Sequence, residues 1–183
     1  TLCSLNWALH HAKVHSNIKR IVIVLPFLSI IDQTAKELKS IFKDHDVILE
    51  HHSNVIYEGK ESEEEYYCKD PKQLATENWD YPIVVTTTVQ FFESLFSNQR
   101  SKCRKLHNLQ DSIVIFDEIQ TLPVHLAECT MKMLNDMLHL CRCSILFCTA
   151  TQPNFQTRSD FKGIDHIVPL VENPTAIFAA TKR

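Results

Sequence analysis

Residues 112–118 constrain the fold more than any other stretch, because an unbroken apolar run leads there directly into two acidic residues. Four consecutive apolar residues, three of them β-branched, precede Asp117 and Glu118. A run that is apolar at every position, rather than at alternate positions, is typical of a parallel strand buried on both faces. We therefore predict a buried strand whose carboxyl end presents the two acids.

Further apolar runs predict four more strands, which alternate with helices. The strands are expected over residues 20–25, 47–49, 82–86 and 144–148. Helices are expected at residues 1–15, after a Ser29 cap, at residues 71–78, at residues 89–97 after a Thr88 cap, and after Pro123. This alternation predicts an α/β fold with a doubly wound, mainly parallel sheet and helices on both faces. No internal linker is evident, so residues 1–183 are interpreted as a single domain.

The acidic pair has a chemical and a structural interpretation. In open parallel sheets, ligands bind at the carboxyl edge. There one acid can hold a hydrated Mg²⁺ while the other orients or deprotonates a water, as in the Walker B arrangement of phosphate-loop NTPases. The alternative is a solvated acidic pair that merely ends a strand. Polar residues at the ends of other strands favour the chemical interpretation, because they would meet on the same edge: Pro26 and Ser29, Thr87 and Thr88, Thr149 and Thr151.

Composition limits the possible functions without selecting one. The net charge of −3 does not indicate a basic nucleic-acid-binding surface, although local amides and a few basic side chains can still hold a phosphate backbone. No apolar run approaches the roughly 18 residues of a membrane span. The seven cysteines are odd in number and lack the paired spacing of a zinc site, which favours a reducing, cytoplasmic location.

Glycine is scarce, with only Gly59 and Gly163 in the chain. A loop that wraps a phosphate with its backbone amides needs clustered glycines. The 183 residues therefore contain no phosphate loop.

Several polar clusters keep two interpretations open. The glutamate-rich residues 58–65 are expected to form a solvated loop. From the residues alone, His51 and His52 are expected in a plain surface loop. A small basic cluster is either solvated surface or a phosphate contact; its members are Arg100, Lys102, Arg104 and Lys105.

Five segments together resemble a known family. DEIQ at 117–120 and TATQP at 149–153 resemble motifs II and III of superfamily 2 helicases. LPFLSIIDQTA at 25–35 and VTTTVQFFESLF at 85–96 resemble motifs Ia and Ib, and TLCSL at 1–5 resembles the segment after a Walker A Gly-Lys. The combination is similar to the CRISPR-associated helicase-nuclease family of type I interference systems, over residues 1–153.

The resemblance implies the first RecA-like motor domain of such a helicase, a P-loop NTPase fold truncated at its Walker A loop. Residues 154–183 would be a tail leading towards an absent second motor domain. The implied cofactors are ATP and Mg²⁺. By position, Thr1 and Asp117 would hold Mg²⁺, Glu118 would activate the attacking water, and Gln120 would sense the γ-phosphate or contact the second motor domain.

The resemblance also implies a path for DNA and a coupling element. By resemblance, His51 and His52 would belong to a polar segment after motif Ia that faces DNA, which is the alternative to a plain surface loop. Thr149, Ala150 and Thr151 would couple hydrolysis to movement. The expected partners are single-stranded DNA, held by Pro26, Ser29, Thr87 and Thr88, and a Cascade-type CRISPR surveillance complex in antiviral defence.

We expect the 183 residues alone to fold but to hydrolyse ATP poorly, because the Walker A Gly-Lys is missing. Two alternatives stay open: another superfamily 2 helicase that acts on RNA, and a non-catalytic protein that keeps the fold to bind partners.

Overall fold

The computed structural model describes residues 2–43, 45–53, 71–151, 153–171 and 179. Its centre is a five-stranded sheet in the order β2-β3-β1-β4-β5, and every neighbouring pair of strands is parallel. The predicted α/β fold with a parallel sheet is therefore confirmed. The strand bounds are β1 Arg20–Leu25, β2 Ile48–His51, β3 Ile83–Thr87, β4 Ser112–Asp117 and β5 Ser144–Cys148.

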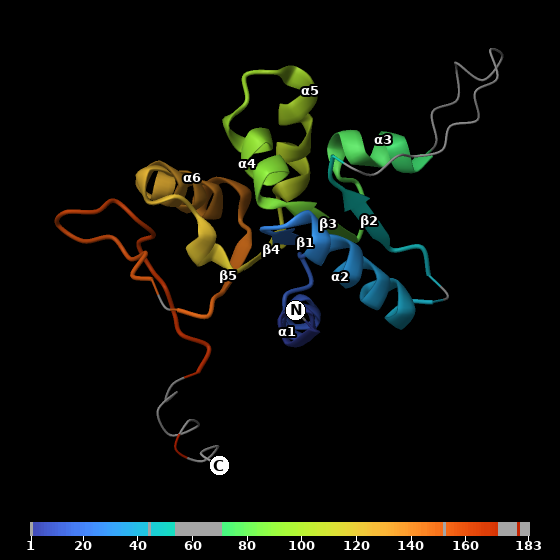
Figure 1. Ribbon diagram of the computed structural model, residues 1–183, viewed down its shortest axis with the longest axis horizontal. Helices are drawn as coiled ribbons and strands as arrows, with labels where there is room; N and C mark the ends of the chain where they lie inside the picture. Colours follow the sequence, from blue (N-terminus) through green and yellow to red (C-terminus); the bar gives the residue numbers. More distant parts are fainter. Residues whose placement is uncertain (1, 44, 54–70, 152, 172–178, 180–183) are drawn as a thin grey trace.

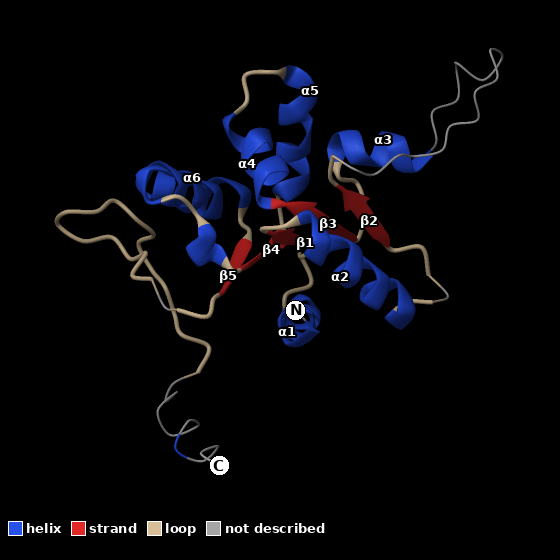
Figure 2. Cartoon of the chain, viewed as in Figure 1, coloured by secondary structure: helices blue, strands red, loops and turns tan. Residues whose placement is uncertain are grey.

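Helices cover both faces of the sheet (Figure 1). Helices α1 (Leu2–Val14) and α2 (Leu28–Ile41) lie on one side. The opposite side carries α3 (Pro71–Asn78), α4 (Thr88–Phe96), the short α5 (Arg100–Cys103), the 3-10 helix η2 (Arg104–Leu109) and α6 (Val124–Cys141). Figure 2 shows the strands as a layer between these two groups. The sheet is thus doubly wound, as the alternation of strands and helices predicted.

Alternate residues of each strand supply the two cores. In β1, Ile21 and Ile23 pack with Leu5 of α1 and Ile31 of α2. Val22 and Val24 belong to the core on the other face, which is formed with α4 and α6. Because successive side chains of a strand point to opposite faces, both faces must be apolar. Each fully buried aliphatic side chain contributes about 1.5–3 kcal/mol, which explains why the apolar runs are continuous.

The strand register brings the carboxyl ends of four strands to one edge. Leu25, the last residue of β1, pairs with Thr87, the last residue of β3. Asp117, the last residue of β4, pairs with Cys148, the last residue of β5. We call this side of the sheet the carboxyl edge. The residues that follow these strands are therefore neighbours in space.

Two predicted helix caps are wrong, each by a small shift in position. Thr87, not Thr88, caps α4, because the Thr87 hydroxyl accepts a hydrogen bond from the Gln90 amide at 3.0 Å. Ser29 is not a cap either, since α2 begins at Leu28 after an extended Phe27 and has no side-chain cap. Helix bounds inferred from residue type commonly miss by one or two residues.

The segment after β5 folds back onto the sheet instead of leaving it. Ile164 is 2% exposed, and the Phe155 ring lies 5.7 Å from the ring of Phe147 in β5. Gly163 permits this packing, because a Cβ atom there would overlap the carbonyl oxygen of Phe155. Where a motor domain ends and a tail begins stays a prediction.

The helices of the described residues give no candidate for a membrane span, since none is both long enough and apolar enough. The predicted acidic loop at residues 58–65 lies outside the described residues.

Candidate functional site

The acidic pair stands at the carboxyl edge in an unusual backbone conformation. Asp117 ends β4, and Glu118 follows it with φ 53° and ψ 41°. A residue other than glycine in this left-handed region costs roughly 1–2 kcal/mol. Such strain is typically kept where the side chain has a task, because it turns that side chain in a direction that a regular strand or helix does not allow. Glu118 is the N-cap residue of the 3-10 helix η3 (Ile119–Thr121), without a side-chain capping bond.

Gln120 connects the acidic pair to the loop that follows β5. Its side-chain Nε2 donates a hydrogen bond to the Glu118 carboxylate. Its Oε1 accepts a hydrogen bond of 2.5 Å from the Thr149 hydroxyl. One amide therefore links a residue after β4 to a residue after β5. The structure thus brings together Glu118, Gln120 and Thr149, all of them candidate residues from the sequence.

Thr149 also faces a second acceptor. Its hydroxyl lies within hydrogen-bond distance of the Thr151 carbonyl oxygen as well as of Gln120 Oε1. A hydroxyl has one hydrogen to donate, so only one of these bonds can be complete at a time. Thr149 can consequently exchange its hydrogen bond between the two loops. The neighbouring Ala150, also a candidate, is exposed.

Helix α1 begins beside the same edge. Burial raises the pKa of the Cys148 thiol, the nearby charge of Asp117 raises it further, and a hydrogen bond with Ser4 lowers it. The Ser4 contact places the first turn of α1 next to the end of β5. A helix amino terminus carries a partial positive charge and free amides, which suit a phosphate. Thr1, the candidate Mg²⁺ ligand at this position, lies outside the described residues.

The candidate DNA-contact residues lie on the same edge, beyond β1 and β3. Pro26 follows β1, and Ser29 is in the first turn of α2. The Thr87 hydroxyl caps α4, and the Thr88 hydroxyl donates to the Leu25 carbonyl at 3.2 Å. Both threonine hydroxyls therefore hold the β3–α4 turn in place. The Thr87 hydroxyl accepts in its capping bond, so its hydrogen can still be donated to a phosphate, whereas the Thr88 hydrogen is already donated to Leu25.

Three members of the basic cluster at residues 100–105 are paired or buried. Lys102 pairs with Glu93 at 3.2 Å, and Arg104 pairs with Glu77 at 3.1 Å. Lys105 is 6% exposed and its Nζ lies 5.7 Å from the centre of the Trp79 ring. Burial lowers the pKa of Lys105. The interpretation of all four basic residues as solvated surface is wrong for Lys105, because η2 places this side chain against Trp79 and out of solvent.

A polar hollow next to this cluster opens beside β2. It has a volume of about 610 Å³ and is lined in part by His51, Gln90 and Lys102. His51 accepts a hydrogen bond from the Trp79 indole at 3.1 Å. Burial, followed by the charges of Lys105 and His52, lowers the pKa of His51 to about 4. His51 is therefore a neutral acceptor at pH 7.

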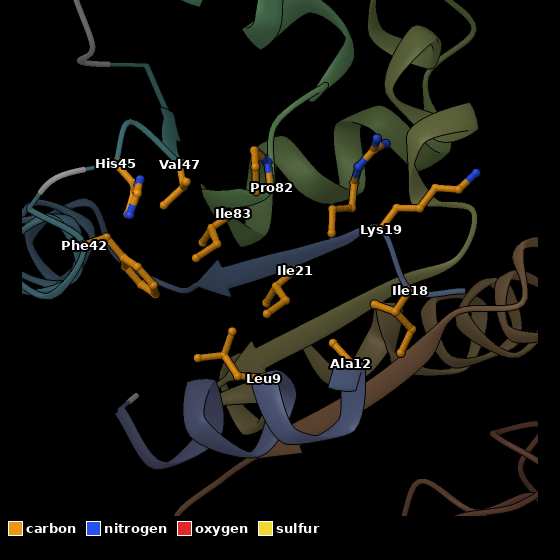
Figure 3. Close-up of a pocket in the computed structure, with 11 residues that line it drawn as sticks. Leu9, Ala12, Ile18, Lys19, Ile21, Phe42, His45, Val47, Pro82 and Ile83 are labelled. Carbon is orange, nitrogen blue, oxygen red and sulfur yellow. The ribbon is translucent and has the colours of Figure 1, made fainter. Parts of the chain in front are cut away.

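An apolar pocket lies at the opposite end of the strands and has different chemistry (Figure 3). It has a volume of about 330 Å³ and lies between α1, the Phe42 ring and the starts of β1 and β3. The described residues that line it include Leu9, Ile21 and Ile83 and no acidic residue. They therefore offer no carboxylate to a metal ion or its bound water.

The oxygen ligands at the carboxyl edge suit a Mg²⁺ ion. Carboxylate and hydroxyl oxygens are the protein ligands that Mg²⁺ prefers, and Asp117, Glu118 and Thr149 supply them on adjacent loops. The backbone of Glu118 was not predictable from its residue type. The hydrogen bonds of Gln120 could be anticipated in part from its position. An amide side chain two residues after Glu118 can donate to that carboxylate and accept from a neighbouring loop.

The chain has a RecA-like α/β fold. Its five parallel strands have the order described above, and an acidic pair and a threonine loop lie at the carboxyl edge. The chain belongs to the DEAD/DEAH box helicase family, which matches residues 1–159. It is also similar to the CRISPR-associated nuclease/helicase Cas3 of Haloferax volcanii, with 31% identity over 144 residues. That match covers 73% of this chain and 15% of the relative, so the chain spans a small part of the relative's length.

Proposed function

We propose that this chain is one motor half of an ATP-dependent helicase that moves along single-stranded DNA in type I CRISPR interference. The observation that carries the proposal is the hydrogen-bonded series from Glu118 through Gln120 to Thr149. It joins the residues proposed for hydrolysis to those proposed for coupling. The similarity to Cas3 supports the CRISPR context.

In this proposal the two acids divide the work at the nucleotide. Asp117, at the end of a buried strand, would hold hydrated Mg²⁺, which would offset charge on the phosphates. Glu118 accepts the proton of the attacking water. Its left-handed backbone turns the carboxylate off the strand axis, and the Gln120 amide fixes one carboxylate oxygen by donating to it. The other oxygen is left to take the proton.

Coupling follows from the shared hydrogen of Thr149. With the Gln120 bond formed, the loop after β5 is tied to the acidic pair. When Gln120 turns towards the γ-phosphate or a second motor half, Thr149 donates to the Thr151 carbonyl instead. The loop after β5 is then free to move relative to β4. The nucleotide state would thus be passed to the DNA-facing surface.

The DNA path in this proposal crosses the ends of β1 and β3, at Pro26, Ser29, Thr87 and Thr88. Its support is their common position on the carboxyl edge. The threonine hydroxyls act mainly by holding the β3–α4 turn in place. The implied partner in the full-length protein is a Cascade-type surveillance complex, which would deliver the single strand.

The 183 residues alone should turn over ATP poorly, because electrostatic stabilisation of phosphoryl transfer needs Lys, Mg²⁺ and Arg together. Two glycines, at positions 59 and 163, do not form a phosphate loop within the chain. Robust turnover by this chain that disappears in Glu118→Gln would contradict this part of the proposal.

The nucleic-acid preference is tested with the full-length helicase. Its ATP turnover is measured with single-stranded DNA, with RNA of the same sequence, and without nucleic acid. We expect strong stimulation by DNA and little by RNA. Stimulation by RNA alone would indicate an RNA-directed helicase, and no turnover under any condition would indicate a non-catalytic binding protein.

A further inference from the structure

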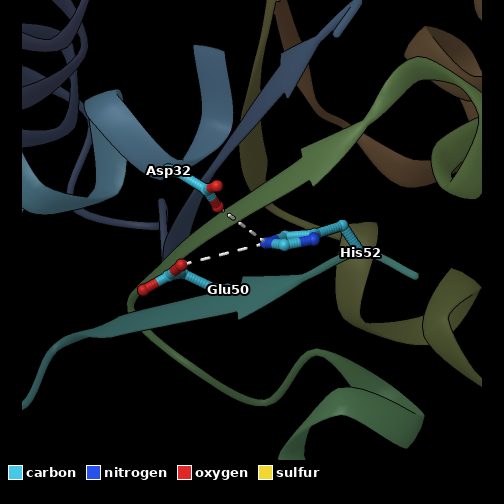
Figure 4. Close-up of side chains that lie close together, drawn as sticks. All are labelled: Asp32, Glu50 and His52. Atoms are coloured by element: carbon cyan, nitrogen blue, oxygen red, sulfur yellow. Dashed lines mark ion pairs between the residues drawn. The ribbon is translucent and has the colours of Figure 1, made fainter. Parts of the chain in front are cut away.

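A cluster of three metal-binding residue types lies outside the proposed ATP and DNA positions. It consists of Asp32 in α2, Glu50 in β2 and His52 just after β2 (Figure 4). One ligand atom of each residue lies within 4.8 Å of the others. Glu50 and His52 are two positions apart on an extended segment, so both side chains point to the face that α2 covers.

We propose that Asp32, Glu50 and His52 form a binding site for one divalent transition-metal ion, with Zn²⁺ as the expected occupant. His52 Nε2 lies 3.6 Å from Asp32 Oδ1 and 3.9 Å from Glu50 Oε2. A direct charged hydrogen bond would be about 2.7–2.9 Å. Two ligands of a tetrahedral zinc ion with bonds of about 2.0–2.1 Å are roughly 3.4 Å apart. The observed separations are closer to the second geometry.

The burial of the three side chains suits an ion with protein and water ligands. The His52 side chain is 3% exposed and that of Glu50 is 18% exposed, whereas that of Asp32 is 61% exposed. The imidazole is thus fixed by its surroundings, and solvent reaches the ion from the Asp32 side. Three protein ligands plus water form an open zinc site. Imidazole suits Zn²⁺, whereas Mg²⁺ prefers oxygen ligands.

The neighbouring side chains are compatible with metal binding by these three residues. The Lys39 ammonium pairs with Oε1 of Glu50, while Oε2 faces His52. The adjacent His51 is not a candidate ligand, because its Nδ1 accepts from Trp79 on the other face of the sheet. A bound ion would tie α2 to β2, close to Ser29 and the carboxyl edge. The site therefore has a structural role in this proposal.

The proposal is tested by titrating the metal-free protein with Zn²⁺ in a calorimeter. We expect one ion per chain in this site, with affinity lowered about tenfold or more by Asp32→Asn or Glu50→Gln. Asp32 is exposed, so its variant should fold even if His52→Asn does not. Co²⁺ should give a visible absorption band with the wild type that Asp32→Asn loses.

Three matched variants distinguish this site from metal binding elsewhere on the chain. Glu37→Gln removes another acid of α2, and His15→Asn removes a histidine from the His11–His15 pair beside α1; both should keep full affinity. Lys39→Met removes the same ion pair that Glu50→Gln removes, but it should still bind Zn²⁺. Zn²⁺ should also raise the Tm of the wild type more than that of Asp32→Asn. Absent binding, or binding unchanged in Asp32→Asn and Glu50→Gln, would overturn the proposal.

Discussion

Strand β4 lies between Asp111 and Glu118, two acidic residues whose carboxylates have different surroundings. Before its amino end, Asp111 has a side chain that is 4% exposed and paired with Arg142 at 2.9 Å and Lys19 at 3.8 Å. At its carboxyl end, Glu118 is partly exposed and accepts from the Gln120 amide. Among the described residues, no salt bridge includes Glu118.

Both residues share a left-handed backbone, with φ 54° for Asp111 and 53° for Glu118. Aspartate adopts this conformation more readily than most residues, because its short side chain bonds locally. Glutamate has no such advantage. The amino end therefore combines a tolerant residue with fixed positive partners, which is a structural arrangement. The carboxyl end combines strain with a carboxylate held by an amide rather than by a cation, which favours a ligand-binding role.

The largest expected effect is at the carboxyl end. Asp117→Asn in the full-length helicase should lower DNA-stimulated ATP turnover by about 10²–10³-fold, because a neutral amide holds the hydrated Mg²⁺ poorly. The Mg²⁺ concentration needed for half-maximal turnover should rise. Turnover and Mg²⁺ dependence equal to the wild type would place the metal elsewhere.

At the amino end the effect should be on stability. Asp111→Ala should lower the free energy of unfolding by about 1–3 kcal/mol, measured by urea denaturation of the chain. The loss stays moderate because Lys19 and Arg142 are both 65% exposed and return to water. In the full-length helicase, ATP turnover per folded molecule should not change. A loss of turnover without a loss of stability would reverse the roles of the two ends.

Backbone strain at Glu118 predicts a smaller effect on stability. Glu118→Gly should be about 1 kcal/mol more stable than Glu118→Ala, because glycine adopts positive φ without steric cost. Urea denaturation of the two variants measures the difference directly. Equal stability of the two variants would show that the left-handed conformation of Glu118 is not strained. The backbone would then not distinguish Glu118 from Asp111.

The smallest stability effect is expected at the Thr149 hydroxyl, for which we propose a coupling role. Thr149→Val should change the free energy of unfolding by less than about 1 kcal/mol, because the hydroxyl gives up one partly solvated hydrogen bond. DNA unwound per ATP consumed should fall several-fold in the full-length helicase. Thr157→Val is a matched control, since this threonine of the segment after β5 bonds Asp165 and not Gln120. Equal loss in both variants would remove the proposed role of Thr149.

Much of the fold could be predicted from the sequence, because buried parallel strands are apolar at every position. Strand β4 and helix α3 lie close to where the residues placed them. The helical turns at residues 100–109 were not predicted, because this segment is rich in charged residues and has no apolar periodicity. Only Lys105 and Leu109 are buried there. Periodic patterns reveal a helix only when its inner face is apolar.

Only the site residues that directly follow a predicted strand could be identified from the sequence. The sequence located Asp117, Glu118 and Thr149 because each follows an apolar run. It did not reveal the left-handed Glu118 or the two acceptors of Thr149, since both depend on how the loops close after folding. The cluster of Asp32, Glu50 and His52 was also missed, because its residues meet only once α2 packs against β2.

The most direct test of the proposed roles compares Glu118→Gln with Asp111→Asn in the full-length helicase. The measurement is ATP turnover per folded molecule at saturating single-stranded DNA. Glu118→Gln should lose at least about 10²-fold, the usual effect of removing a general base, while still binding nucleotide. Asp111→Asn should keep wild-type turnover. Equal turnover in both variants, or a selective loss in Asp111→Asn, would contradict the assignment of the carboxyl edge as the catalytic end of β4.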